Sequence, residues 1–269
     1  MIPKFTLLGR ELLSYNVFAV LGALAGAALA WRPLRRCGFS RAGAGGLLAG
    51  MCAAFLIGAR LWNVAVAPET FDDALPWDAP RLAGLSLYGG ILGAFIVLAA
   101  VCRKRKLPAA LDALVLPSGV AFCLSRVGCF LNGCCGGIRT ALPWGVVFPK
   151  PIPKVDLGVF KLSFEKPVHP TQLYELALAV AGLPLAVWLA KKLRLPEGGR
   201  FLLYGIWFCA MRLAILPLRA LHYRTGVAEL GYPVLYGGLI LLGIWLVIYM
   251  KRIEKDAHAE AGASFCNEY

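Results

Sequence analysis

Seven apolar stretches, each close to 20 residues long, constrain the fold of this chain more than any other feature. They lie near residues 12–31, 44–67, 85–102, 109–131, 171–190, 201–219 and 231–250. A helix of about 20 apolar residues crosses a hydrocarbon core, where backbone polar groups must bond within their own segment. Hydrophobic residues form 59% of the sequence and charged residues 16%, which excludes an ordinary soluble domain. We therefore predict an all-α integral membrane protein with about seven transmembrane helices.

The basic residues are confined to the short gaps between these stretches. Lysine and arginine dominate the gaps after the first, third and fifth stretches and the segment after the seventh, whereas four acidic residues and Arg81 follow the second. Under the positive-inside rule, this distribution predicts an N-terminus outside and a C-terminus inside. The net charge of +13 would suggest nucleic acid in a soluble protein, but here it indicates orientation, and we expect no nucleic-acid partner.

The first stretch could also be taken for a cleaved signal peptide. Lys4, Arg10, the apolar run and the small residues Ala28 and Ala30 imitate its three regions. However, four arginines follow the run and only two basic residues precede it. This asymmetry favours a retained first helix with its N-terminus outside.

The chain is predicted to form one membrane domain, because it contains no convincing repeat or low-complexity segment. We assign residues 1–250 to this domain and residues 251–269 to a flexible cytoplasmic tail. The gap at 132–170 is predicted to form a small external cap. Its segments 143–149 (PWGVVFP) and 161–164 (KLSF) have short extended character.

Arg126 lies within the fourth stretch, just before a glycine-rich turn that ends at Gly137. An arginine at membrane depth costs roughly 2.5 to 3.5 kcal/mol on insertion and normally persists where it meets an anion, carbonyl groups or water. A phospholipid headgroup is the obvious anion. The segment therefore predicts a reaction site embedded in the membrane.

Other polar side chains within the stretches are Tyr15, Arg60, Asp112, Arg212 and Arg219. Such groups usually face the bundle interior or a wet cavity. Asp112 and Arg60 could simply tie helices together by ion pairing. Arg126 and Arg212 are better explained by anion binding, since the stretches hold too few carboxylates to neutralise them, and Glu175 is expected near the outer face.

The heptapeptide HPTQLYE, residues 169–175, leads from the cap into the fifth stretch. Pro170 suits a helix start, and Glu175 suits the positive N-terminal end of the helix dipole. On a helix, Thr171, Tyr174 and Glu175 share one face, with Gln172 adjoining. This pattern fits a helix cap as well as it fits a polar binding pocket.

Four motifs together resemble the prolipoprotein diacylglyceryl transferases, a family of bacterial inner-membrane enzymes. They are LYGGILG at 87–93, RVGCFLNG at 126–133, PWGVVFP at 143–149 and HPTQLYE at 169–175. The resemblance implies seven spans, a site toward the external or periplasmic face, and no cofactor. It also implies transfer of the diacylglyceryl group of phosphatidylglycerol to the thiol of a lipobox cysteine in a prolipoprotein, with release of glycerol phosphate.

The resemblance assigns roles to individual residues. Arg126 matches the essential arginine of the family's signature, and Arg212 matches the arginine of its sixth span. Their guanidinium groups can bind a phosphate in bidentate fashion and stabilise the charge that builds on it. Arg219 matches a second arginine of the sixth span. The residues expected to bind substrate are Tyr15, Asp112, Asn132, Gly137, Gln172, Tyr174, Glu175, Arg219, Gly89 and Gly90.

Tyr88 departs from the family, which usually has His-Gly-Gly where this chain has Tyr88-Gly89-Gly90. A tyrosine, with an ordinary pKa of about 10, is a poor base for a thiol but can orient a phosphate by hydrogen bonding. His169 could be the base, or the thiol could lose its proton in the field of the arginines, where cations favour the thiolate. We favour the second route and include Tyr88 and His169 among the candidate catalytic residues.

Cys129, Cys134 and Cys135 also depart from the family pattern. They could be small apolar residues, a disulfide in an oxidising compartment, reactive or lipid-accepting thiols, or metal ligands. Paired CxxC spacing is missing, so the sequence predicts no metal site. These changes leave two other functions open, namely a paralogue with a different acceptor and a non-enzymatic membrane protein that binds a lipid or a thiol compound.

Overall fold

The computed structural model describes residues 4–7, 10–66, 85–102, 106–148, 166–220 and 230–266. Two short strands precede the helices, β1 (Lys4–Leu7) and β2 (Arg10–Leu13). The helices are α1 (Ser14–Arg36), α2 (Arg41–Val66), α3 (Leu87–Val101), α4 (Leu107–Asn132), α5 (Thr171–Lys192), α6 (Gly199–Ile215) and α7 (Tyr232–Cys266), with a 3-10 turn, η2 (Leu216–Leu218), after α6.

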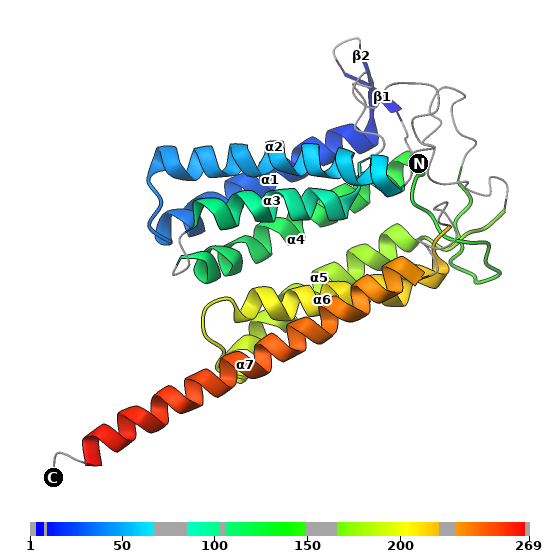
Figure 1. The fold of residues 1–269 in the computed structure, drawn as a ribbon. Coiled ribbons are helices and arrows are strands. Elements are labelled where there is room, and N and C mark those ends of the chain that lie inside the picture. The colour runs from blue at the N-terminus through cyan, green and yellow to red at the C-terminus, as the bar shows by residue number, and fades with distance from the viewer. Residues whose placement is uncertain are drawn as a thin grey trace.

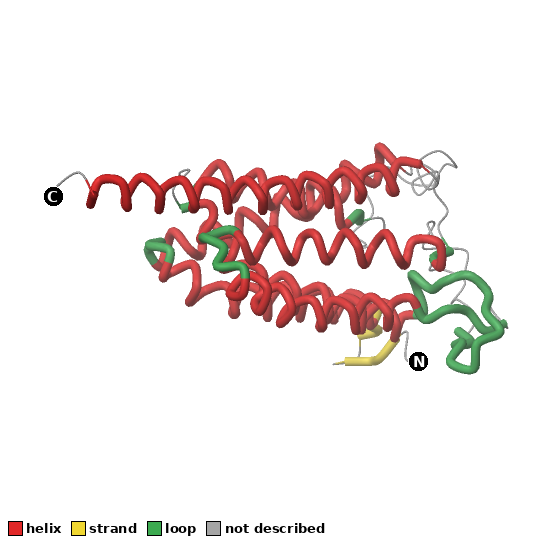
Figure 2. Tube along the Cα trace, turned by 90° about the horizontal axis from the view of Figure 1, so that it is seen from below, coloured by secondary structure: helices red, strands yellow, loops and turns green. Residues whose placement is uncertain are grey.

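The helices lie side by side in two groups (Figure 1). The first group holds α1 to α4, in which α1 packs on α4 and α2 on α3; the second holds α5 to α7, in which α6 packs on both neighbours. Helix α4 joins the groups through contacts with α5 and α6. The strands and the loop that follows α4 gather at one end of the bundle (Figure 2).

The helices have the length and surface of membrane spans. Among the described residues, six helices are long and apolar enough to cross a membrane, and α3 is a shorter apolar helix of 15 residues. Large apolar side chains point outward, among them Leu24 (63% exposed), Ile96 (58%) and Leu241 (69%). Such a surface is stable against lipid tails but not against water. The prediction of an all-α, multi-pass membrane protein is confirmed.

The structure adds an element at each end of the chain. Strands β1 and β2 form an antiparallel pair, with Lys4 opposite Leu13 and Leu7 opposite Arg10, which the sequence analysis missed. At the other end, α7 continues as far as Cys266, so most of the segment assigned to a tail is helical. The flexibility and the cytoplasmic location of this tail stay predictions.

Within the segment predicted to be extended, residues 143–149, the backbone pairs at Val146 only, residues 143–144 form a turn, and residue 149 lies outside the described residues. Val146 and Val168 exchange two backbone hydrogen bonds of 3.0 Å. Phe148 is 1% exposed, and its ring lies 6.0 Å from that of Phe130 on α4, so the cap is anchored to the end of that helix. The predicted segment 161–164 lies outside the described residues.

Glycines allow α2 and α3 to approach backbone to backbone. A Cβ atom at Gly89 would overlap the carbonyl oxygen of Gly58, and one at Gly93 would overlap that of Ala54. A Cβ atom at Gly90 would lie 2.5 Å from the ring of Phe55. Both positions therefore face α2 and serve helix packing, and their expected role in binding substrate stays a prediction.

Replacing Gly89 by alanine is expected to lower the free energy of unfolding by about 1–3 kcal/mol, because two rigid backbones must move apart to admit a methyl group. Thermal unfolding of the purified protein in detergent measures this change. Gly237→Ala on α7 is the matched control, since its Cβ atom would meet nothing within 4 Å. Equal unfolding temperatures for the two variants would contradict the packing role.

Candidate active site

Three arginines from different parts of the chain meet one carboxylate. Glu175 lies in the first turns of α5 and is 1% exposed. Its Oε2 atom lies 3.0 Å from Nε of Arg126 on α4. Its Oε1 atom accepts hydrogen bonds from Nη1 of Arg212 near the end of α6 and from Nη1 of Arg219, the latter at 2.8 Å. We call these four residues the arginine cluster.

The arginine cluster is buried and rich in positive charge. Arg126, Arg212 and Arg219 are 9%, 7% and 8% exposed. Even Arg126 and Arg212 alone bring two guanidinium groups to the one carboxylate of Glu175. Taking ions out of water costs several kcal/mol each, and that cost is offset only by well-placed opposite charge. The cluster is therefore suited to receive a further anion.

Glu175 was expected near the outer face, in a candidate polar pocket next to an inward-facing arginine. In the structure, both of its carboxylate oxygens contact guanidinium groups. These contacts hold the arginines in position, and its expected role in binding substrate stays a prediction.

An aromatic group surrounds Arg212. The hydroxyl oxygen of Tyr88, at the start of α3, accepts a hydrogen bond of 3.1 Å from Nε of Arg212, whose Cζ atom lies 5.8 Å from the tyrosine ring. Tyr236 accepts a second bond of 3.3 Å from the same Nε atom. The rings of Tyr232 and Tyr236 stack at 6.0 Å and both lie beside Tyr88. Sequence reasoning missed this pair, although its spacing of four residues puts both tyrosines on one face of α7.

The start of α5 holds the loop that follows α4. Thr171 Oγ1 donates a hydrogen bond of 2.8 Å to the carbonyl oxygen of Cys135, and Gln172 Nε2 donates one of 2.6 Å to that of Cys134. Gln172 is fully buried. These two residues of the heptapeptide therefore position the cysteine loop, and the expected role of Gln172 in binding substrate stays a prediction.

His169 and Tyr174 belong to the cap. The Tyr174 hydroxyl accepts a hydrogen bond of 2.7 Å from Trp144 Nε1, and its oxygen lies 3.3 Å from Nδ1 of His169. The two rings meet edge to face at 6.1 Å. Among the described contacts, none joins His169 to the arginine cluster, so the structure does not place it as a base beside Arg126.

Gly137 allows close approach between the cap and the segment that carries Arg219. Gly137 and Arg219 form an isolated antiparallel bridge, and Ile138 N donates a bond of 2.9 Å to the carbonyl oxygen of Leu218. A Cβ atom at Gly137 would overlap that same oxygen. Gly137 thus positions Arg219, and its expected role in substrate binding stays a prediction.

Asp112 lies far from the arginine cluster. It is on α4, 14 residues before Arg126, which corresponds to about 21 Å along a helix. Its carboxylate accepts bonds of 2.8 Å from Phe201 N and 3.3 Å from Arg200 Nε at the start of α6, and it lines a cavity of about 600 Å³ there. Asp112 thus caps the N-terminal end of α6 with its negative charge and pairs with Arg200, while its expected role in binding substrate stays a prediction.

Asn132 and Tyr15 both lie at the end of the bundle that holds the cluster. Asn132 is the last residue of α4, half-buried, and the helix ends at Gly133 with a φ of 75°. Tyr15 is in the first turn of α1, where its hydroxyl interacts electrostatically with Arg126 and with three cysteines. Both therefore remain close enough to take part in the site.

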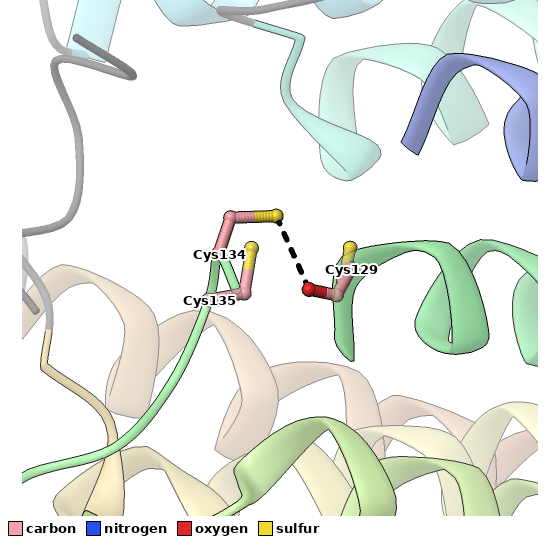
Figure 3. A group of neighbouring side chains, drawn as sticks. All are labelled: Cys129, Cys134 and Cys135. Carbon is pink, nitrogen blue, oxygen red and sulfur yellow. Dashed lines mark hydrogen bonds between the residues drawn. The ribbon is translucent and has the colours of Figure 1, made fainter. Parts of the chain in front are cut away.

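Those cysteines, Cys129, Cys134 and Cys135, form a compact group (Figure 3). Their sulfur atoms all lie within 4.8 Å of one another, and all three are free thiols. Cys134 Sγ lies 3.7 Å from the carbonyl oxygen of Cys129, and donates to it. Hydrogen bonds from the other two thiols hold the pKa of Cys135 well below its usual range, and the charges of Arg126 and Arg219 add to this effect.

Known proteins are similar in sequence to this chain over most of its length. Three relatives are named phosphatidylglycerol–prolipoprotein diacylglyceryl transferase. The relative from Nitratidesulfovibrio vulgaris is 33% identical over 61% of this chain and 60% of its own length, and that from Dehalococcoides mccartyi 32% over 66% and 65%. The relative from Tropheryma whipplei is 29% identical over 70% of both chains. The match thus spans less than two thirds of the first two relatives.

The family described as prolipoprotein diacylglyceryl transferase matches residues 4–249 of this chain. This range includes every helix described above except the last part of α7. It also includes the whole arginine cluster and the cysteine group. The chain therefore belongs to the prolipoprotein diacylglyceryl transferase family.

Proposed function

We propose that this protein transfers the diacylglyceryl group of phosphatidylglycerol to the thiol of a prolipoprotein lipobox cysteine, with release of glycerol phosphate. The observation that carries this proposal is the burial of Arg126 and Arg212 around the carboxylate of Glu175, the one carboxylate that meets them within the described part of the chain. A buried site with more guanidinium than carboxylate groups favours an anionic ligand. The names of the relatives support phosphatidylglycerol as that ligand.

In the proposed reaction, the thiol sulfur forms a bond to the glyceryl carbon while the bond from that carbon to the phosphate oxygen breaks. The electron pair leaves with the phosphate, and the thiol proton passes to water. Arg126 and Arg212 bind the phosphate and stabilise the charge that develops on it. Tyr88, whose oxygen already accepts a bond from Arg212, can donate its own proton in a hydrogen bond to a phosphate oxygen.

Tyr15 and Asn132 are assigned to the side from which the substrates approach, and Tyr174 to the cap above it. Tyr15 starts α1 and Asn132 ends α4, so both lie at the same end of the bundle as the arginine cluster. Their hydroxyl and amide groups can donate and accept hydrogen bonds. This suits contacts with the glycerol headgroup and with the peptide that carries the acceptor cysteine.

We assign the protein to the bacterial cytoplasmic membrane, with its N-terminus and site toward the external face and its C-terminus inside. The last turns of α1 and α5 carry Arg35, Arg36, Lys191 and Lys192. These turns lie at the end of the bundle opposite the cap and the cluster. Basic residues at that end favour its placement in the cytoplasm, and the relatives with this family name are bacterial.

Mass spectrometry of a lipobox peptide incubated with the protein and phosphatidylglycerol tests the proposal. We expect a diacylglyceryl mass increment on the peptide cysteine and an equal amount of released glycerol phosphate. Replacement of that cysteine by serine should prevent both. If the folded protein gives no increment while an active relative does under the same conditions, the proposed reaction is wrong, and lipid binding without turnover would favour a non-enzymatic role.

Tyr88→Phe is expected to lower kcat about tenfold, because it removes one hydrogen bond to a charged group, worth roughly 1.5 kcal/mol. Arg212 keeps its bonds to Tyr236 and Glu175, so the fold should not change. Tyr249→Phe is the control, because Tyr249 is 50% exposed on α7. An unchanged kcat in Tyr88→Phe would show that the hydroxyl does not act on the substrate.

A further inference from the structure

We propose that Cys129, Cys134 and Cys135 bind one Zn²⁺ ion in an open site whose fourth position accepts the thiol of the acceptor cysteine. The inference rests on the proposed function and adds to it the means by which the thiol is activated. The sequence spacing predicted no metal here. The structure brings together three thiols that the spacing alone did not connect.

The positions of the three sulfur atoms suit a zinc ion. Three sulfurs bound to one tetrahedral Zn²⁺ at about 2.3 Å lie roughly 3.8 Å apart. The observed sulfurs are all within 4.8 Å of one another, so small side-chain rotations bring them to that spacing. Cys129 lies in the last turn of α4, and the turn after Gly133 folds the other two back toward it (Figure 3).

The backbone of the cysteine loop is held in place before any metal arrives. The carbonyl groups of Cys134 and Cys135 are bonded to Gln172 and Thr171, and Cys135 has a positive φ of 62°. This conformation is uncommon for a residue other than glycine and directs two neighbouring cysteine side chains to the same side. A preorganised set of ligands binds a metal without the entropic cost of ordering a loop.

The charge of the surroundings also suits a zinc thiolate centre. Three thiolates and one Zn²⁺ carry a net charge of −1. Arg126 interacts electrostatically with Cys129 and Cys135, and Arg219 with Cys135. The positive charge of the arginine cluster therefore lies beside a centre that would carry net negative charge, at the same end of the bundle where the phosphate is expected.

The described part of the chain supplies three ligands to this group and no fourth histidine, cysteine or carboxylate. Structural zinc sites are usually closed by four protein ligands, whereas catalytic sites have three and leave one position open. Zinc binds thiols as thiolates and deprotonates them at neutral pH. An open three-cysteine site beside a phosphate-binding cluster is therefore suited to hold a substrate thiol as a nucleophile.

This arrangement explains how the reaction can proceed with Tyr88 in place of a histidine. The acceptor thiol binds Zn²⁺ and gives its proton to water. Its sulfur then forms a bond to the glyceryl carbon, and the phosphate leaves with the electron pair of the broken carbon–oxygen bond toward Arg126 and Arg212. The product sulfur is a neutral thioether, which is a weaker zinc ligand than a thiolate, so the product can leave.

Metal analysis of the purified protein is the first test. We expect one zinc per chain in the wild type and in Cys52→Ser, whose cysteine is exposed on α2, and less than a tenth of that in Cys134→Ser. Replacement of zinc by Co²⁺ should give a sulfur-to-cobalt charge-transfer band. Protein without zinc after purification in zinc-containing medium, or with a disulfide among the three cysteines, would overturn the proposal.

A peptide titration tests the open position. The cobalt band should shift on addition of a lipobox peptide and remain unchanged with the peptide in which serine replaces cysteine. Because Cys134→Ser could fold poorly, the wild type treated with a chelator gives an independent comparison, and Zn²⁺ should restore its thiol binding. A cobalt spectrum that does not respond to the peptide thiol would contradict an open site.

The two proposals fail in different ways. If zinc-free protein transfers the diacylglyceryl group at the full rate, the zinc proposal is wrong and the proposed function stands. If the protein binds zinc and the peptide thiol but no lipid is transferred, the proposed function is wrong and the metal site stands.

Discussion

Arg126→Ala is expected to lower kcat/KM for diacylglyceryl transfer by about a thousandfold, the size of effect seen when one preorganised donor to a developing negative charge is removed. The protein should remain folded, because Glu175 keeps Arg212 and Arg219 as partners and is not left as an isolated buried charge. The measurement is the initial rate of glycerol phosphate release with a lipobox peptide, together with the unfolding temperature of the variant.

Two further variants make this result specific. Arg126→Lys keeps the positive charge but loses the planar, bidentate geometry of the guanidinium group, so it should recover only a small part of the rate. Arg35→Ala removes an exposed arginine from the last turn of α1, at the end of the bundle opposite Arg126, and should leave the rate unchanged. A rate for Arg126→Ala within a factor of three of wild type would contradict the assigned role.

Glu175→Gln is expected to lower the free energy of unfolding by about 3–5 kcal/mol, because removal of one partner from a buried ion pair leaves the other charges uncompensated. Glutamine has nearly the same shape, so the effect reports charge rather than packing. The guanidinium groups of Arg126 and Arg212 would then face each other without the carboxylate between them. Denaturation in detergent measures the change.

Glu197→Gln provides the matched control, since Glu197 is exposed in the turn before α6, and its removal should have little effect. Arg126→Ala in the Glu175→Gln background should restore part of the lost stability by removing one of the repelling charges. If Glu175→Gln unfolds at the wild-type temperature, the carboxylate does not neutralise the cluster, and the arginines must be compensated in another way.

The membrane helices were predictable because their signal is local. About 20 consecutive apolar residues can span the bilayer as a helix whatever the neighbouring segments do. The seven stretches correspond to α1 to α7. The strands β1 and β2 were missed because their pairing is a short contact at the chain end. The last part of α7 was missed because a polar helix outside the apolar stretch has no hydrophobic period to reveal it.

The site was predictable as a set of residue types but not as an arrangement. Arginines within apolar stretches, such as Arg126 and Arg212, are conspicuous in the sequence because placing a charge at membrane depth costs free energy. Nothing near either residue in the sequence indicates that both contact Glu175, which lies on a third helix. Asp112 carries the same cost signal, but it serves the start of α6 instead. The same limit applies to Gly89, since nothing in the sequence near this glycine indicates that it packs against α2.

The contact between Arg126 and Glu175 joins the two helix groups of the bundle, because Arg126 is on α4 and Glu175 is on α5 (Figure 1). Arg212 is on α6, and Arg219 follows η2 directly after that helix. Any movement that separates α4 from α5 lengthens the Arg126 contact and takes one guanidinium group away from the other two. The three guanidinium groups therefore meet at one carboxylate only when the two helix groups are closed against each other, so that an opening of the bundle would also disperse the positive charge of the cluster.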